Sequence, residues 1–324
     1  MIKEATKPSS LLAQEFNLLQ DFNLLIDEPM RNYTSFKIGG PADLLALPED
    51  KMELKNLIMR AWELEIPVTL VGGGTNLLVR DRGIRGLVII TKQLRSKIAI
   101  QDTNPDTNSD TNSNTNSNTK TIIVDAGERL SKVCQFAINN NLSGLEFAAG
   151  IPGTIGGAIK MNAGTKSGDM STIIKSIEVL DENTFEINKI DNRLLDFSYR
   201  HLDLSQIIVS ATLTLKKEKQ KKIEDNFIYN LIKRNANQPV SEASPGCFFK
   251  NPPIGKSAGE LIEKSGLKGV KVNDAMISEK HANFIVNRGN ASCEDVLSLK
   301  QQIQKRVFDK FNIQLENEVK IEGE

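Results

Sequence analysis

Apolar residues in this chain repeat at two spacings, one typical of amphipathic helices and one typical of strands. Leu12, Phe16, Leu19 and Phe22 share the helical spacing, which predicts a short helix within residues 9–25. The same spacing predicts later helices over residues 50–65, 130–141, 220–235, 258–264 and 293–311. Alternating or β-branched runs predict strands in PADLLALP, VTLVGGG, GIRGLVIIT, LRSKIAI, TIIVDAG, IIVSATLTLKK and EVKIEG, a hairpin in IKSIEVLDENTFEINKI, and strands near Met276 and Phe284.

Changes in this pattern divide the chain into domains. Residues 1–28 are expected to form an N-terminal helical segment, and residues 29–219 open with a βαβ-like arrangement followed by further strands. The charged run KKEKQKKIEDN interrupts the apolar pattern and indicates a boundary near Lys219. Residues 220–324 then mix short helices and strands, which predicts a smaller α+β domain.

One segment offers nothing to a core. Residues 102–119 contain only Asp, Thr, Asn, Pro and Ser. Ordering a residue costs about 1 to 2 kcal/mol, and this segment has no apolar side chain whose burial could offset that cost. We therefore expect a disordered low-complexity loop between two strands.

Charge and composition narrow the function. Lys plus Arg and Asp plus Glu each number 41, so the net charge is zero, which disfavours nucleic acid or an anionic membrane as a partner. The N-terminal segment MIKEATKPSSLLAQEFNLLQ interrupts its apolar residues with Gln, Glu and Asn, unlike a secretory leader or a membrane span. A cytoplasmic location is expected.

Cysteines and histidines give no metal pattern. Cys134, Cys247 and Cys293 lie far apart with no CxxC spacing, which disfavours a zinc site or a disulfide framework. With His201 and His281 as its only histidines, the chain is not expected to hold a histidine-rich metal centre.

Two glycine-rich loops carry the first chemical signal. They read VGGGTNLLV from Val71 and GIPGTIGGAIKMNAG from Gly150. Glycines let main-chain N–H groups approach a diphosphate closely, because no Cβ intervenes and positive φ costs little. Neither loop has the form of the GxGxxG fingerprint or of a P-loop. A tight turn is the structural alternative for either loop, but two such loops favour a nucleotide cofactor.

Several motifs, taken together and in order, resemble the UDP-N-acetylenolpyruvoylglucosamine reductases of peptidoglycan synthesis. They are NYTSFKIGGPAD, VGGGTNLLV, GIPGTIGGAIKMNAG, FSYR, SPGCFFKNP, KHANFIVN and LENEV. The resemblance is to the shorter form of that family. It implies an α+β fold, with an FAD-binding domain of the vanillyl-alcohol-oxidase-like type followed by a smaller α+β substrate-binding domain whose last strand returns to the active site.

The resemblance also implies a reaction. NADPH would reduce FAD, and the reduced flavin would give hydride to the methylene carbon of UDP-N-acetylglucosamine enolpyruvate, yielding UDP-N-acetylmuramate. No nucleic acid, membrane or obligatory protein partner is implied. Two alternatives stay open: a flavin oxidase of the same fold acting on a sugar lactone or hydroxy acid, and a non-catalytic nucleotide-binding or redox-sensing protein.

The implied chemistry assigns three catalytic residues. By resemblance Arg200 binds the substrate carboxylate, Cys247 donates a proton to the carbon next to the methylene, and Glu318 assists charge stabilisation. Cys247 departs from the family, where this position is usually Ser, but a thiol with a reference pKa of about 8.5 is mostly protonated near neutral pH and can donate a proton. The structural alternatives are a surface ion pair for Arg200, a buried packed thiol for Cys247 and a solvated strand residue for Glu318.

Binding residues follow from the same motifs. The residues expected to bind FAD are Gly72, Gly73, Gly74, Thr75, Asn76, Gly150, Gly153, Thr154, Gly157 and Asn162. Those expected to bind substrate are Tyr199, Lys250, Asn251 and His281. A packed Tyr199 and a hydrogen-bonded structural His281 are the alternatives, and no metal ligand is expected.

Overall fold

The computed structural model describes residues 8–17, 22–101 and 118–324. The chain divides into two compact units, the first made of Met1–Pro48, Asn56–Ile90 and Asn235–Glu324, the second of Glu49–Lys55 and Thr91–Arg234. Within the described ranges, no helix is both long enough and apolar enough to cross a membrane. The domain limits drawn at residues 28 and 219 stay a prediction.

A four-stranded sheet organises the first part of unit 1, in the order β1 (Leu24–Pro29), β2 (Pro41–Ala46), β5 (Ile84–Ile90), β3 (Val68–Val71). β2 and β3 both run parallel to β5, whereas β1 is antiparallel to β2. Helix α2 (Lys51–Glu63) lies between β2 and β3 in the sequence, so the βαβ-like opening is confirmed. Helix α1 (Ser9–Phe16) precedes the sheet.

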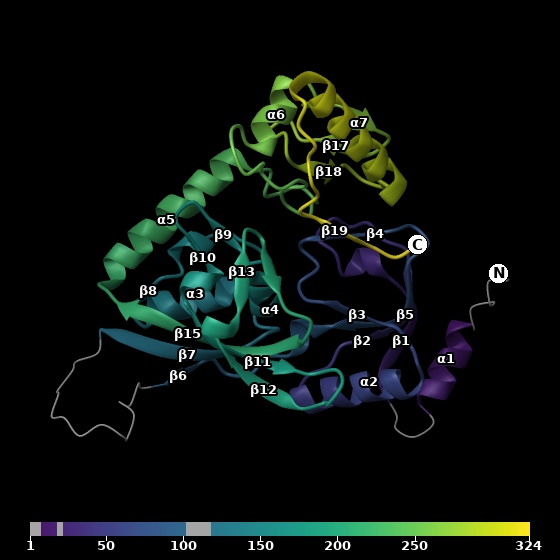
Figure 1. The fold of residues 1–324 in the computed structure, drawn as a ribbon, viewed down its shortest axis with the longest axis vertical. Coiled ribbons are helices and arrows are strands. Elements are labelled where there is room, and N and C mark those ends of the chain that lie inside the picture. The colour runs from purple at the N-terminus through teal and green to yellow at the C-terminus, as the bar shows by residue number, and fades with distance from the viewer. Residues whose placement is uncertain (1–7, 18–21, 102–117) are drawn as a thin grey trace. The chain divides into compact units, whose positions relative to one another are not determined.

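The end of the chain returns to this part of unit 1. Strand β19 (Lys320–Glu322) pairs in parallel with β4 (Leu77–Val79), and Figure 1 shows the yellow C-terminal strand beside it. The first glycine loop lies between β3 and β4. The C-terminal residues are therefore fixed next to that loop.

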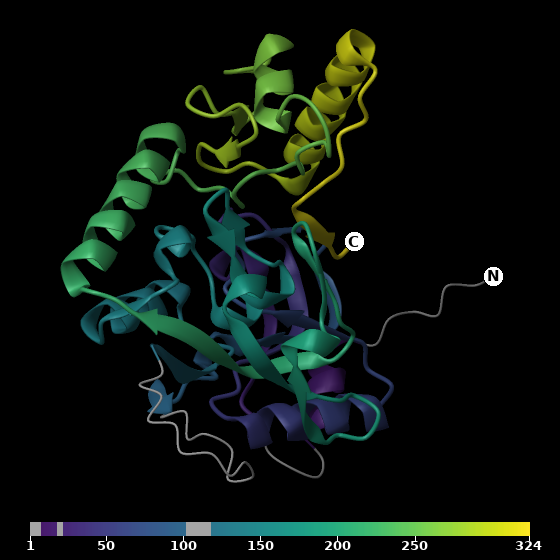
Figure 2. The same ribbon diagram turned by 60° about the vertical axis from the view of Figure 1, so that its left-hand side comes forward.

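The rest of unit 1 packs two helices on a small sheet. The sheet has the order β16 (Lys271–Val272), β17 (Ala275–Ile277), β18 (Ile285–Asn287). Helices α6 (Ala258–Lys264) and α7 (Cys293–Phe311) contact each other beside it (Figures 1 and 2). A capping box of Ser292 and Asp295 begins α7, and Asn312 in a left-handed conformation ends it.

Unit 2 is built on an antiparallel sheet in the order β12 (Ile187–Asp191), β11 (Ile174–Leu180), β15 (Ile207–Lys217), β7 (Thr119–Asp125), β6 (Ala99–Gln101), with β8 (Leu142–Ser143) also on β15. Helices α3 (Leu130–Asn139) and α4 (Ile155–Lys160) bury their apolar side chains in the same core as this sheet. Helix α5 (Gln220–Asn237) follows β15, as Figure 2 shows.

Short elements complete the two units. The paired ones are β9 (Gly164–Thr165) with β10 (Gly168–Asp169), and β13 (Asp196–Ser198) with β14 (His201–Asp203). The 3-10 helices are η1 (Met30–Asn32), η2 (Thr91–Gln93), η3 (Glu146–Ala148), η4 (Met170–Thr172) and η5 (Asn192–Leu194).

The structure corrects two predicted elements. The helix expected to reach residue 25 ends at Phe16, and Leu24 and Leu25 are already in β1, paired with Ala46 and Leu45. In LRSKIAI only the end is strand, because η2 makes the chain turn at Leu94, whose N–H donates to Thr91 and whose carbonyl accepts from Gly127. Of the disordered loop predicted over residues 102–119, residues 102–117 lie outside the described residues, and Thr119 is already in β7.

Candidate active site

The first glycine loop is held by the segment that precedes β2. Gly74 has a φ of +64°, and a Cβ on it would lie 1.9 Å from the main-chain oxygen of Tyr33. The N–H of Ser35 donates to the carbonyl of Gly74 at 3.0 Å. Gly74 is therefore required by the fold. The segment of residues 32–43 holds the first glycine loop in place through this hydrogen bond and the close contact at Tyr33.

The same loop is tied to Glu318. The Asn76 side-chain amide donates to the carbonyl of Glu318 at 3.0 Å, and the N–H of Lys320 donates to the carbonyl of Asn76 at 3.1 Å. Glu318 is half-buried and lies just before β19 rather than within it, whereas Glu316 is exposed. Two residues assigned to different roles from the sequence, Asn76 and Glu318, thus meet in unit 1.

Main-chain hydrogen bonds connect the segment that follows Cys247 to the segment that contains Glu318. The N–H of Glu318 donates to the carbonyl of Phe248 at 2.9 Å, and the N–H of Lys250 donates to the carbonyl of Glu316 at 2.9 Å. Gly246 has a φ of +91°, which gives the expected turn before Cys247. The Cys247 thiol side chain is half-buried, so it is not one of the core cysteines.

The remaining predicted residues of unit 1 border this segment or α6. Asn251 accepts a hydrogen bond from the N–H of Ala258 at 3.0 Å, at the start of α6. His281 accepts one from the N–H of Asn283 at its Nδ1 at 3.3 Å, and its ring meets Phe284 edge-on at 5.0 Å. Burial, aided by the nearby Lys268, lowers the pKa of His281. The geometry matches the structural alternative for His281, while its substrate contact stays a prediction.

The second glycine loop lies in unit 2. Gly150 and Gly153 have φ values of +72° and +116°, which favour glycine. The N–H of Leu130 donates to the carbonyl of Gly153 at 3.0 Å, and Thr154 caps α4 by accepting from the N–H of Gly157 at 3.4 Å. The start of α3 and the cap of α4 therefore fix the loop at Gly153 and Thr154, where it enters α4.

Gly157 is a different case from Gly74. It lies inside α4, and the nearest protein atom to a Cβ built there is Thr154 Oγ1 at 3.5 Å, among described residues outside the helix backbone. Glycine inside a helix costs about 0.5 to 1 kcal/mol relative to alanine. No close neighbour among the described residues explains why a glycine lies here. The space over Gly157 therefore fits a ligand that approaches the main chain.

Tyr199 and Arg200 form the tip of the β13–β14 hairpin, where Ser198 pairs with His201. Arg200 has a φ of +58°, unusual for a long side chain. Its guanidinium donates to the carbonyl of Gly164 at 2.8 Å and lies 5.1 Å from the ring centre of Tyr199. Arg200 is half-buried and Tyr199 is 51% exposed.

Two side chains from the end of the second glycine loop hold this hairpin. The buried amide of Asn162 donates to the carbonyl of Ser198 and accepts from the N–H of Ser171, both at 3.1 Å. Lys160 donates to the carbonyl of Leu202 at 3.3 Å and also to that of Leu204. The Asn162 amide thus faces protein main chain, and its contact with FAD stays a prediction.

The sequence alone did not point to Lys160 or to the buried Asn283. Both lie inside motifs that were used for other residues, in IKMNAG and in KHANFIVN. A hydrogen bond from a side chain to protein main chain has no chemical signature in a single sequence.

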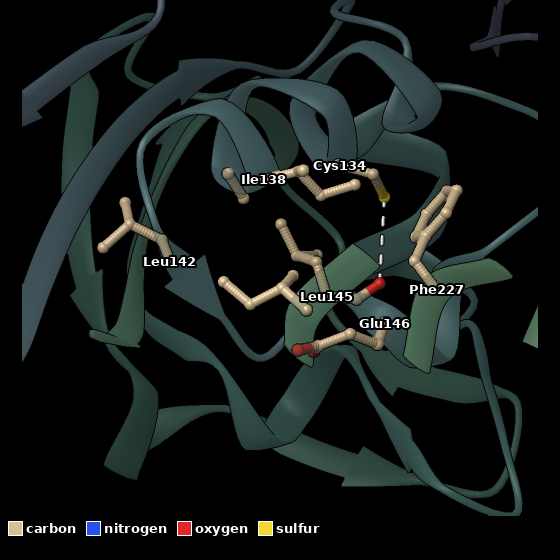
Figure 3. A pocket seen from close by; sticks show the side chains of 8 residues that line it. Cys134, Ile138, Leu142, Leu145, Glu146 and Phe227 are labelled. Atoms are coloured by element: carbon tan, nitrogen blue, oxygen red, sulfur yellow. Dashed lines mark hydrogen bonds between the residues drawn. The ribbon is translucent and has the colours of Figure 1, made fainter. Parts of the chain in front are cut away.

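A small apolar pocket in unit 2 contains none of the predicted site residues. Figure 3 shows Cys134, Ile138, Leu142, Leu145 and Phe227 around it, with the Cys134 thiol directed at the Leu145 carbonyl 3.8 Å away. Burial raises the pKa of Cys134 to about 12. Cys134 is therefore the packed cysteine expected from its helix. Among the described residues, no group of three His, Cys, Asp or Glu could hold a metal.

Comparisons with known proteins bear on both parts of the chain. Residues 238–322 match the C-terminal domain of UDP-N-acetylenolpyruvoylglucosamine reductase, and residues 42–184 match an FAD binding domain. The reductase of that name from Caldanaerobacter subterraneus subsp. tengcongensis is 42% identical over 310 residues, 95% of this chain and 96% of that protein. The one from Latilactobacillus sakei is 40% identical over 307 residues, 94% and 95% of the two chains.

A solved structure extends the similarity to the fold. The crystal structure of the reductase from Thermus caldophilus matches with a TM-score of 0.75 at 34% identity, covering 94% of this chain and 99% of that one. The expected α+β fold, with an FAD-binding domain followed by a second domain, is confirmed. Because the chain is 42% and 40% identical to these two reductases over 95% and 94% of its length, it belongs to the UDP-N-acetylenolpyruvoylglucosamine reductases.

Proposed function

We propose that this protein reduces UDP-N-acetylglucosamine enolpyruvate to UDP-N-acetylmuramate with FAD and NADPH, and that Arg200, Cys247 and Glu318 carry the chemistry. The observation that supports it most is the match of residues 238–322 to the reductase's own C-terminal domain, which holds Cys247 and Glu318 joined through Phe248. FAD, when bound, accepts hydride from NADPH and delivers it to carbon. The main chain of the two glycine loops would hold it, and the open space over Gly157 fits that role.

Arg200 binds the carboxylate of the enolpyruvyl group in this proposal. A guanidinium offers parallel N–H donors that match a carboxylate, and charge-assisted hydrogen bonds of this kind are among the strongest. The side chain is placed by its bond to Gly164 and by the hairpin that Lys160 and Asn162 hold. A non-glycine residue at positive φ costs about 1 to 3 kcal/mol, and such strain concentrates at functional sites.

Cys247 protonates the carbon next to the carboxylate. Its thiol is the proton donor in this proposal, and the turn at Gly246 places it at the start of a rigid segment. Negative charge builds up beside the carboxylate until that proton arrives. Glu318, whose N–H donates to the carbonyl of Phe248, would stabilise that state by donating a hydrogen bond from a protonated carboxyl group, since an ionised carboxylate would repel the charge.

The substrate's UDP-sugar part would contact Tyr199, Lys250, Asn251 and His281. A neutral imidazole that accepts a hydrogen bond at Nδ1 carries its proton on Nε2. With its pKa lowered, His281 can therefore offer an Nε2–H to a phosphate oxygen without being charged. Lys250 supplies the positive charge in the same segment.

The proposal includes a cytoplasmic location and no nucleic-acid, membrane or obligatory protein partner. The three cysteines, all in the described part of the chain, carry thiols rather than disulfides, as is usual in a reducing compartment. We would not expect an oxidase of the same flavin fold to carry the reductase's C-terminal domain, which residues 238–322 match. A non-catalytic protein would not consume NADPH in response to the enolpyruvyl substrate.

The direct experiment measures NADPH oxidation by the FAD-loaded protein with and without UDP-N-acetylglucosamine enolpyruvate. We expect oxidation that requires the substrate and yields a product heavier by two hydrogens. Oxygen consumption that requires a sugar lactone or a hydroxy acid, rather than NADPH, would support the oxidase. No turnover with any of these substrates would support the non-catalytic alternative.

A further inference from the structure

Asn283 binds the segment that follows Cys247 with both its side chain and its main chain. Its side chain is 3% exposed. Its Oδ1 accepts from the N–H of Phe249 at 3.0 Å, and its Nδ2 donates to the carbonyl of the same residue at 2.8 Å. Its own carbonyl accepts from the N–H of Phe248 at 2.8 Å. One residue therefore fixes both main-chain groups of Phe249 and one of Phe248.

The opposite side of this segment is bound by the end of the chain. The carbonyl of Phe248 accepts from the N–H of Glu318 at 2.9 Å and from that of Val319 at 3.4 Å, and Phe249 forms a bridge with Asn317. Phe248 and Phe249 are 0% and 1% exposed and pack edge-to-face at 5.2 Å. Asn283 thus sets the position of the same two residues that connect Cys247 to Glu318.

We propose that Asn283 is a positioning residue for proton transfer, holding Cys247 and Glu318 in their relative arrangement through Phe248 and Phe249. A proton donor acts only within hydrogen-bond reach of its acceptor, and small displacements of the donor cost rate steeply. A buried amide that both donates to and accepts from one residue makes a stiff connection. This inference rests on the proposed function, because it assigns Cys247 the proton.

A matched control lies four positions further along the same motif. Asn287 is also buried, and its amide donates to the carbonyl of Phe36 at 3.1 Å and accepts from the N–H groups of Gly289 and Ala291 at 2.9 and 3.1 Å. These partners lie outside the segment of residues 247–249. Loss of either amide removes buried hydrogen bonds, but only Asn283 bonds to that segment.

The test compares Asn283→Ala and Asn287→Ala in the FAD-loaded protein by stopped-flow absorbance of the flavin. One measurement follows flavin reduction by NADPH, and the other follows reoxidation by UDP-N-acetylglucosamine enolpyruvate after reduction. We expect Asn283→Ala to slow reoxidation at least tenfold while flavin reduction changes less than twofold. Asn287→Ala should leave the ratio of the two rates within twofold of the wild type, whatever its melting temperature.

The outcomes separate this inference from the proposed function. If the wild type shows no substrate-dependent reoxidation, the proposed function fails. If the wild type reacts and Asn283→Ala slows both steps equally, slows neither, or behaves as Asn287→Ala does, the positioning role is wrong. Should Asn283→Ala not fold, Asn283→Ser, which keeps a hydroxyl beside Phe249, is measured against Asn287→Ser with the same criteria.

Discussion

The main-chain N–H of Glu318 donates to the carbonyl of Phe248 at 2.9 Å, so the residue after Cys247 is bonded directly to Glu318. The same Glu318 accepts from the amide of Asn76 in the first glycine loop. Hydrogen bonds within unit 1 thereby join the first glycine loop, the segment that contains Cys247 and the segment that contains Glu318. The catalytic roles proposed for Cys247 and Glu318 depend on this connection.

Replacing Cys247 tests the proton donor. Cys247→Ser should keep most of the activity, since a hydroxyl group can also donate a proton, while Cys247→Ala should still allow NADPH to reduce the flavin. Positioned proton transfer contributes about 10²- to 10⁴-fold to rate, so we expect flavin reoxidation by the substrate to fall by that order in the alanine variant. Stopped-flow absorbance separates the two steps. An alanine variant that turns over normally would show that another group supplies the proton.

The three thiols should differ sharply in reactivity. Burial raises the pKa of Cys134 and of Cys293 to about 12, so at pH 8 their reactive thiolate forms are scarce, and both side chains are also shielded. The half-buried Cys247 should therefore be alkylated first by iodoacetamide in the native protein. Mass spectrometry of peptides locates the label, and Cys247→Ser serves as control. Labelling of Cys134 before Cys247 would contradict the packing seen in Figure 3.

Local elements were predictable where the sequence carries its own end signals. The helices Ala258–Lys264 and Cys293–Phe311 have the expected bounds because Ser257 and Ser292 cap them and a left-handed Asn312 ends the second. The N-terminal helix was predicted too long, because residues that also fit helical spacing are taken into β1 by pairing with β2. Pairing with a distant strand overrides local periodicity.

The site was predictable by residue type but not by connection. Motifs pointed to Cys247 and Glu318, yet nothing in either motif shows that Phe248 bonds to Glu318. The left-handed conformation of Arg200 was also unpredictable, since arginine has no preference for positive φ and the hairpin imposes it. Asn283 went unnoticed for the reason given for Lys160: its partners are main-chain groups.

Arg200 should show a separation between stability and activity. Arg200→Gly removes the penalty of a side chain at positive φ, about 1 to 3 kcal/mol. It also loses the hydrogen bond to Gly164 and the contact with the Tyr199 ring, together worth about 1 to 2.5 kcal/mol. The two terms nearly cancel, so the melting temperature should change by only a few degrees. Substrate-dependent flavin reoxidation should nevertheless fall at least 100-fold, because the carboxylate loses its cation.

The control for this variant is Arg200→Lys, which keeps the charge and the backbone penalty but not the paired donors. We expect it to be intermediate in activity and no more stable than the wild type. If Arg200→Gly stayed active, the carboxylate would have to be bound elsewhere, and the role given to FSYR would be wrong.

Gly157 and Gly74 give opposite expectations for an added methyl group. At Gly74 the methyl would meet the Tyr33 carbonyl at 1.9 Å on a backbone with φ of +64°, so Gly74→Ala should destabilise the apoprotein. At Gly157, which lies within α4, the methyl group would be 3.5 Å from its nearest described neighbour outside the helix backbone, Thr154 Oγ1. Gly157→Ala should therefore leave the apoprotein as stable as before or raise its stability by up to about 1 kcal/mol.

The affinity of the Gly157→Ala variant for FAD tests whether the cofactor occupies the space over Gly157. If the cofactor approaches the main chain there, the methyl group blocks it, and Gly157→Ala should weaken FAD binding at least tenfold despite the unharmed apoprotein. Thermal unfolding without FAD and fluorescence titration with FAD give the two quantities on the same preparation. Unchanged affinity in a stable Gly157→Ala would mean that the cofactor does not come close to α4, and the assignment of Gly157 to FAD would have to be withdrawn.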